Sequence, residues 1–175
     1  MNFQNTIKML KVVLSVGDES GIGPEIILKA LCSKQIPKNI DFIIVGSKKN
    51  LQNTYEYLRS LGLKNLANPK KFKIQDLEIS SSGNDPKSSY GNSSFQYLTK
   101  AIEIVKQYPN SALVTGPICK KSWSLAGHYF SGQTEVLAKS CRVKNVGMLF
   151  TAKSPITGWR FNTLLATTHL SLIHI

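Results

Sequence analysis

The sequence predicts an α/β protein in which helices are layered on both faces of a mixed, mostly parallel sheet. Short apolar runs alternate with segments whose apolar residues recur every three or four positions, as strands alternating with helices do. After the middle of the chain this alternation stops, and two strand-like runs follow one another directly. We therefore expect two subdomains, residues 1–116 and 117–175.

The first half of the chain carries the alternation. Apolar and β-branched residues predict strands at 11–17 and 41–46. A helix with Pro24 in its first turn follows the first strand, and a helix that ends at Gly62 follows the second. Strands separated by helices favour a parallel sheet.

The middle of the chain predicts one more strand and one long helix. The strand lies near 74–79, and the segment 80–92, which reads SSSGNDPKSSYGN, has the composition of an exposed loop. A helix is expected from Ser93 until shortly before Pro109, where it leads into a buried strand at 112–114.

Polar groups gather where that strand ends. Thr115, Gly116 and Pro117 stop the strand, and a short helix with Lys120 and Lys121 follows. A second helix opens at 133–135, and its free N–H groups suit an anionic ligand. Beyond it, strands are expected at 145–151 and 163–168, on either side of a turn at 154–158.

Composition limits the class of protein. The 42% hydrophobic content is typical of a packed core, and 22 basic against 10 acidic residues give a net charge of +12. The lysines are scattered in pairs, which favours a solvated surface over a nucleic-acid partner, although the charge can attract a phosphorylated substrate. Three cysteines without a CxxC pair, no signal peptide and no membrane-spanning run predict a cytoplasmic protein.

The segment GDESGIGPEI, residues 17–26, predicts a glycine turn between a strand and a helix. Gly21 and Gly23 permit a tight turn, and the pattern resembles a dinucleotide-binding fingerprint only loosely, because Ile26 stands where the third glycine belongs. A purely structural turn explains the segment equally well.

Four motifs together resemble one enzyme family. GDESGIGPEI, VTGPICK, AGHYFSGQTEVLA and LLATTHLSL occur in the order found in the 4-hydroxythreonine-4-phosphate dehydrogenase family of vitamin B6 biosynthesis. In that family the motifs belong to the N-terminal half of proteins about twice this long, in keeping with two domains. The chain is therefore expected to be truncated and, by itself, catalytically inactive.

The resemblance implies a fold and a reaction. The fold is that of isocitrate and isopropylmalate dehydrogenases, with the active site in the cleft between two subdomains. The reaction is an NAD- or NADP-dependent oxidation of 4-phosphooxy-L-threonine, followed by decarboxylation to 3-amino-2-oxopropyl phosphate. The resemblance also implies a divalent metal such as zinc, magnesium or cobalt to stabilise the developing alkoxide. It further implies a homodimer that binds a phosphorylated small molecule and neither nucleic acid nor membrane.

Site residues follow from matching the motifs position by position. His169 in TTHLSL matches a metal ligand of the family, although a histidine at a strand end is by itself more often a surface or capping residue. Thr134 matches a substrate-binding threonine, and Gln133 stands where the family has a histidine, so it can hydrogen-bond but not titrate. Helix capping is the alternative role of Gln133 and Thr134. Lys120 closes the VTGPICK motif without an assigned role, and Cys119 before it is expected to be a small filler.

Two other functions stay open. A paralogous dehydrogenase would act on another phosphorylated hydroxy acid or on a diol. A non-catalytic remnant or binding module would keep only the α/β core, and Gln133 in place of the histidine favours this reading.

Overall fold

The computed structural model describes residues 9–79 and 85–166, which belong to two compact units. Unit 1 extends to Ser131, and unit 2 begins at Gly132. This division falls at a different residue from the predicted subdomains 1–116 and 117–175, which stay a prediction for the complete fold. None of the helices in the described part of the chain combines the length and apolar character that a membrane span requires.

Unit 1 is built on a four-stranded parallel sheet. Its strands are β1 (Leu10–Ser15), β2 (Ile40–Gly46), β3 (Lys73–Asp76) and β4 (Ser111–Thr115), in the order β3-β2-β1-β4. In the centre of the sheet, Val13 of β1 pairs with Ile43 on one side and Leu113 on the other. The α/β class and the parallel arrangement expected from the sequence are thus confirmed.

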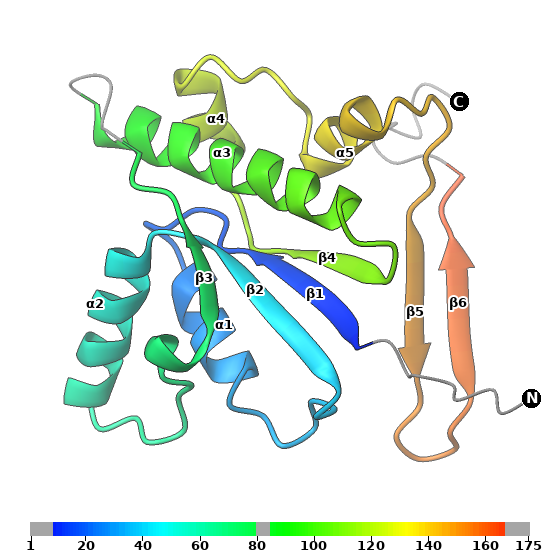
Figure 1. The fold of residues 1–175 in the computed structure, drawn as a ribbon. Coiled ribbons are helices and arrows are strands. Elements are labelled where there is room, and N and C mark those ends of the chain that lie inside the picture. The colour runs from blue at the N-terminus through cyan, green and yellow to red at the C-terminus, as the bar shows by residue number, and fades with distance from the viewer. Residues whose placement is uncertain (1–8, 80–84, 167–175) are drawn as a thin grey trace, which may run out of the picture. The chain divides into compact units, whose positions relative to one another are not determined.

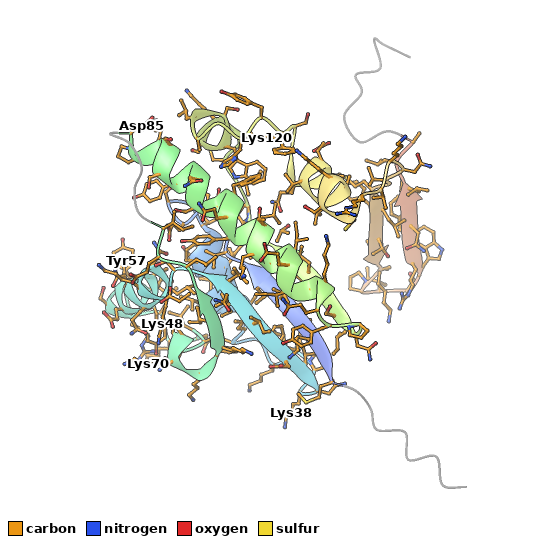
Figure 2. All side chains as sticks on the ribbon, turned by 45° about the horizontal axis from the view of Figure 1, so that its top comes forward. Lys38, Lys48, Tyr57, Lys70, Asp85 and Lys120 are labelled. Carbon is orange, nitrogen blue, oxygen red and sulfur yellow. The ribbon has the colours of Figure 1, made fainter. Side chains whose placement is uncertain are left out.

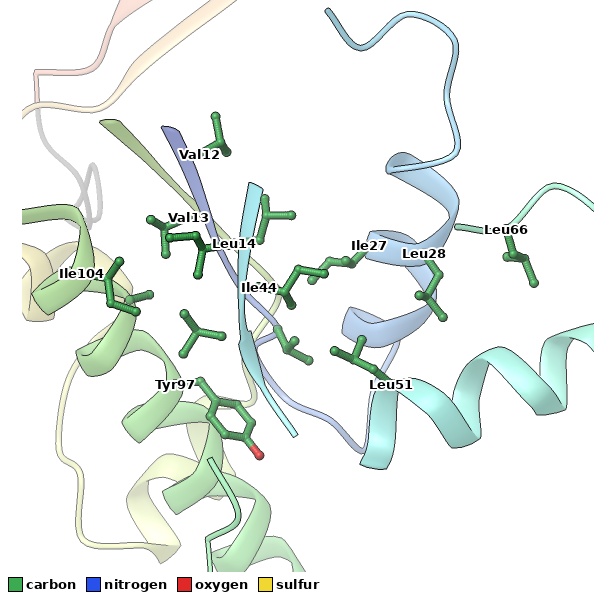
Figure 3. Packing of buried hydrophobic residues seen from close by; sticks show 14 of the residues in the cluster. Val12, Val13, Leu14, Ile27, Leu28, Ile44, Leu51, Leu66, Tyr97 and Ile104 are labelled. Atoms are coloured by element: carbon green, nitrogen blue, oxygen red, sulfur yellow. The ribbon is translucent and has the colours of Figure 1, made fainter. Parts of the chain in front are cut away.

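Helices cover both faces of this sheet (Figure 1). Helices α1 (Gly23–Ala30) and α2 (Lys48–Ser60) lie on one face, and the long α3 (Pro86–Lys106) crosses the other. Figure 3 shows the two halves of the core, with Tyr97 and Ile104 of α3 on one side of the strands and residues of α1 and α2 on the other. A short 3-10 helix, η1 (Pro69–Lys71), precedes β3.

Helix α3 begins earlier than the sequence predicts. Pro86 stands in its first turn, and the Asp85 side chain (labelled in Figure 2) caps it by accepting a 2.9 Å hydrogen bond from the Lys87 N–H. The prediction of an exposed loop through residue 92 was therefore wrong for its last part. The Ser, Gly and Asn residues of this segment have low helix propensity. Packing of the first turns of α3 against the next helix in the chain overrides that low propensity.

The packing partner is α4 (Lys120–Leu125), the short helix expected after β4. A Cβ on Gly91 would lie 2.0 Å from the Ser122 carbonyl oxygen, so only glycine allows α3 and α4 to approach this closely. Trp123 is fully buried, and its Nε1–H donates a 2.7 Å hydrogen bond to Ser94 Oγ. These contacts fix α4, and with it the segment after β4, to the α3 face.

Strand β4 differs from its prediction as a buried strand. It is an end strand of the sheet, Ala112 is exposed, and Val114 keeps 51% of its surface exposed. Sequence alone indicates an apolar strand but not how many neighbours it has.

Unit 2 contains one helix and a two-stranded antiparallel sheet. Helix α5 (Gln133–Cys141) begins where the sequence predicts, and Arg142, whose φ of 57° is left-handed, caps its C-terminal end. Strands β5 (Leu149–Lys153) and β6 (Arg160–Leu164) flank a turn at residues 154–158, closed by a 2.8 Å hydrogen bond from the Ser154 N–H to the Trp159 carbonyl. Both strands lie a few residues from their predicted ranges, and residues 167 and 168 of the second prediction lie outside the described part.

Candidate functional site

The order of the strands creates a switch point at the carboxyl edge of the sheet in unit 1. From β1 the chain moves outward through β2 to β3, then returns through α3 to β4 on the opposite side of β1. The loops after β1 and β4 therefore leave the sheet in different directions. In open α/β sheets, ligands bind in the crevice that such a switch point forms.

Close backbone packing joins these two loops. Gly17 has a φ of +77°, and a Cβ on it would lie 2.3 Å from the Pro117 carbonyl oxygen. A Cβ on Gly116 would lie 2.2 Å from the Val16 carbonyl oxygen. The Asp18 N–H donates a 2.8 Å hydrogen bond to the same Pro117 carbonyl. The loops thus form one continuous surface in which both glycines are required.

Asp18 organises the turn between β1 and α1. Its Oδ1 accepts hydrogen bonds from the Ser20 N–H at 2.9 Å and the Ser20 hydroxyl at 2.7 Å. Gly23, at the start of α1, packs so that a Cβ would lie 2.1 Å from the Val16 carbonyl oxygen. Chain packing therefore accounts for Gly17 and Gly23 of GDESGIGPEI, which supports the structural explanation of this segment.

Beside the turn, a polar hollow of about 450 Å³ opens at the carboxyl ends of β1, β2 and β3. Glu19, Ser47, Lys49 and Glu78 are among its lining residues. The buried Tyr97 reaches it from α3 and donates a 3.2 Å hydrogen bond from its hydroxyl to Glu19 Oε1. Burial raises the pKa of Glu19, aided by the charge of Asp18 and opposed by the Tyr97 hydrogen bond.

The loop after β4 carries Cys119 and Lys120. Hydrogen bonding by Ser122 is the main cause of a lowered pKa of the half-buried Cys119 thiol. Lys120 is the first residue of α4, at the carboxyl end of β4, as the sequence predicts. Figure 2 shows Lys38, Lys48, Lys70 and Lys120 on four different segments of unit 1.

The predicted substrate and metal residues do not all lie in the described part of the chain. Gln133 and Thr134 are the first two residues of α5 in unit 2, where both are half-buried. His169 lies outside the described residues, so its role stays a prediction. His128 packs its ring on Phe95, with centroids 3.8 Å apart and planes at 10°, which is a packing role.

The described residues do not by themselves provide a metal site. Across 9–79 and 85–166, no cluster of three or more His, Cys, Asp or Glu side chains has the arrangement to hold a metal ion. Catalytic zinc generally needs three protein ligands.

Two features of the edge escaped the reasoning from sequence. The Glu19–Tyr97 pair joins residues far apart in the chain, and no local pattern signals it. The contact of the two loops had a weak signal, since Gly17 and Gly116 each come directly after an apolar strand.

The sheet, its two helical layers and the glycine-packed loops define a doubly wound α/β protein, a class in which ligands generally bind at the carboxyl edge of the sheet. The sequence family described as "Pyridoxal phosphate biosynthetic protein PdxA" matches residues 38–175. The chain belongs to this family.

Relatives in sequence carry one enzyme name. The 4-hydroxythreonine-4-phosphate dehydrogenase of Synechococcus sp. (strain RCC307) is 42% identical over 166 residues, covering 94% of this chain and 50% of the relative. That of Nostoc sp. (strain PCC 7120 / SAG 25.82 / UTEX 2576) is also 42% identical and is covered to 47%. The chain thus spans about half the length of the curated relatives it matches.

Solved structures agree on the fold. A 4-hydroxythreonine-4-phosphate dehydrogenase from Burkholderia phymatum superposes with a TM-score of 0.72 at 20% identity, over 95% of this chain and 52% of that one. The enzyme of the same name from Klebsiella pneumoniae gives a TM-score of 0.72 at 22% identity, over 94% and 53%.

Proposed function

We propose that the chain is the N-terminal half of a dehydrogenase that oxidises 4-phosphooxy-L-threonine with NAD or NADP. Decarboxylation of the resulting β-keto acid gives 3-amino-2-oxopropyl phosphate, a step of vitamin B6 biosynthesis. The 42% identity to relatives named 4-hydroxythreonine-4-phosphate dehydrogenase carries this proposal. The working enzyme is proposed to be a homodimer of the cytoplasm that requires a divalent metal.

The chain contributes part of the site in this proposal. Gln133 and Thr134, at the first turn of α5, hold the phosphate or a hydroxyl of the substrate, since a helix start presents free N–H groups to an anion. His169 supplies one metal ligand, and the other ligands come from residues beyond this chain.

The activity of a fusion protein tests the proposal. The second half of the Synechococcus relative would be fused after Ile175, and NADH formation would be followed with 4-phosphooxy-L-threonine and a divalent metal. We expect turnover from the fusion and none from the 175-residue chain. In the fusion, His169→Ala should abolish turnover and lower bound metal, while circular dichroism stays unchanged.

The same fusion separates the alternatives. Turnover of another phosphorylated hydroxy acid in preference to 4-phosphooxy-L-threonine would indicate a paralogous dehydrogenase. A folded fusion that binds metal but oxidises none of these substrates would indicate a non-catalytic remnant, in which Gln133 has replaced a required histidine.

A further inference from the structure

A glutamate and a tyrosine in the polar hollow beside the β1–α1 turn have no role in the proposed reaction. Glu19 follows β1, and Tyr97 of α3, which is only 1% exposed, donates the 3.2 Å hydrogen bond to Glu19 Oε1. A carboxylate has about four acceptor positions on its two oxygens, so this bond orients Glu19 and leaves it acceptor capacity for a ligand. The volume of the hollow, about 450 Å³, lies within the range of small-molecule sites in proteins.

Contacts around the turn hold Glu19 in position. Asp18 Oδ1 accepts hydrogen bonds from the N–H and the hydroxyl of Ser20, which closes the backbone around Glu19. From α2, Asn50 Nδ2 donates a 3.5 Å hydrogen bond to the Glu19 carbonyl. A side chain that is already ordered loses little freedom when a ligand binds, which favours affinity.

The other residues around the hollow provide a donor, charges and apolar surface. Ser47 Oγ accepts a 3.1 Å hydrogen bond from the Asn50 N–H, and its own hydroxyl proton can be donated to a ligand. The remaining lining residues are Lys49, Leu77, Glu78 and Ile79. With both glutamates ionised against one lysine, the hollow carries a net negative charge, which disfavours an anionic group inside it. Neutral hydroxyl groups, which donate to carboxylates, fit this lining better than a phosphate does.

We propose that this hollow binds a ribose of the nicotinamide cofactor, with the Glu19 carboxylate accepting hydrogen bonds from the neighbouring 2′- and 3′-hydroxyls of the sugar. In doubly wound dinucleotide-binding folds, an acidic side chain binds ribose hydroxyls in this way. Ser47 donates to a sugar oxygen, and Tyr97 keeps the Glu19 carboxylate oriented. The inference rests on the dinucleotide cofactor of the proposed function and assigns part of its binding site to unit 1.

Both riboses of the cofactor carry such a pair of hydroxyls in NAD, and NADP distinguishes them. NADP has a phosphate in place of the 2′-hydroxyl of its adenine ribose. If the hollow holds the adenine ribose, Glu19 repels this phosphate, so the protein should prefer NAD, and Glu19→Gln should reduce the preference. If the hollow holds the nicotinamide ribose, Glu19→Gln should weaken NAD and NADP equally.

Calorimetric titration of the fusion protein with NAD⁺ and with NADP⁺, without substrate, tests the site. Glu19→Gln should raise the Kd for NAD⁺ by about tenfold or more, because hydrogen bonds to a charged acceptor are replaced by bonds to a neutral one. Tyr97→Phe keeps the ring but removes the hydroxyl that orients Glu19, and it should raise this Kd less. Glu56→Gln is the matched control, since Glu56 is an exposed carboxylate of α2 that does not line the hollow, and it should leave the Kd unchanged. Circular dichroism of each variant checks that the fold survives.

Two results would overturn the proposal while the proposed reaction stands. In one, the folded Glu19→Gln fusion binds NAD⁺ with an unchanged Kd and still forms NADH from 4-phosphooxy-L-threonine. In the other, Glu56→Gln raises the Kd as much as Glu19→Gln does, so that the loss reflects overall charge. A fusion that binds neither NAD⁺ nor NADP⁺ and forms no NADH would remove both the ribose site and the proposed reaction.

Discussion

Replacing Gly17 with alanine measures how firmly the two loops at the switch point are joined. Two costs arise at this position. Alanine in the left-handed region, at a φ of +77°, costs about 1–2 kcal/mol. Its Cβ would also lie 2.3 Å from the Pro117 carbonyl oxygen, so backbone must move.

The second cost has two parts. Forcing a methyl group into a packed site costs about 1–3 kcal/mol. The movement also weakens or breaks the 2.8 Å hydrogen bond from the Asp18 N–H to the Pro117 carbonyl, which contributes about 0.5–1.5 kcal/mol to stability. Together these contributions predict that Gly17→Ala lowers the free energy of unfolding of unit 1 by about 2.5–6.5 kcal/mol.

Gly62 supplies a matched control. Its φ is +86°, but nothing lies within 4 Å of the position its Cβ would occupy, so Gly62→Ala should cost only the conformational part, about 1–2 kcal/mol. Urea unfolding followed by tryptophan fluorescence reports on unit 1, because Trp123 is fully buried while Trp159 is already 65% exposed. Equal losses in the two variants would refute the reasoning that the loops form one rigid surface.

Three further predictions concern other contacts. Ser94→Ala should lower the stability of unit 1 by about 1–3 kcal/mol in urea unfolding, because Trp123 Nε1–H is left buried without its acceptor. The double variant Ser94→Ala/Trp123→Phe should lose less stability than the two single variants lose in sum. Additive losses would mean that the hydrogen bond between Trp123 and Ser94 contributes nothing to stability. Burial lowers the pKa of His128 below its ordinary value of 6.5, so the unfolded chain binds the proton first as the pH falls. His128 should therefore stabilise unit 1 above pH 6.5 and lose that contribution toward its lower folded pKa, whereas His128→Phe should flatten this pH dependence in unfolding curves. In the fused enzyme, Gln133→Val should raise KM for the phosphorylated substrate roughly 5- to 150-fold, and an unchanged KM would leave Gln133 with only a helix-starting role.

Local patterns in the sequence were sufficient for most of the fold. Apolar runs located the four parallel strands, and Pro24 and Gly62 marked helix boundaries, because backbone constraints at these residues act whatever the rest of the chain does. The start of α3 was missed because Gly91 lowers helix propensity locally but is required by a contact with Ser122. Such a contact, between residues far apart in the chain, leaves no trace in a window of neighbouring residues.

The site was less predictable than the fold. The motif near Gln133 correctly gave a helix start, since helix initiation is a local property. The partnership of Glu19 with Tyr97 depends on α3 crossing the sheet, which no spacing within either segment encodes. The exposure of Val114 depends on the number of neighbouring strands, which is a property of the assembled sheet.

The position of β1 in the sheet also sets the order in which this protein can fold. Val13 pairs with Ile43, which follows it soon in the chain, and with Leu113, which is synthesised only after helices α2, η1 and α3. Contacts between residues so distant in sequence close slowly, because the intervening chain loses much freedom before they form. During synthesis, β1 and β2 can pair early. The other edge of β1 stays unpaired until β4 has been made, and until then it can pair incorrectly with other segments.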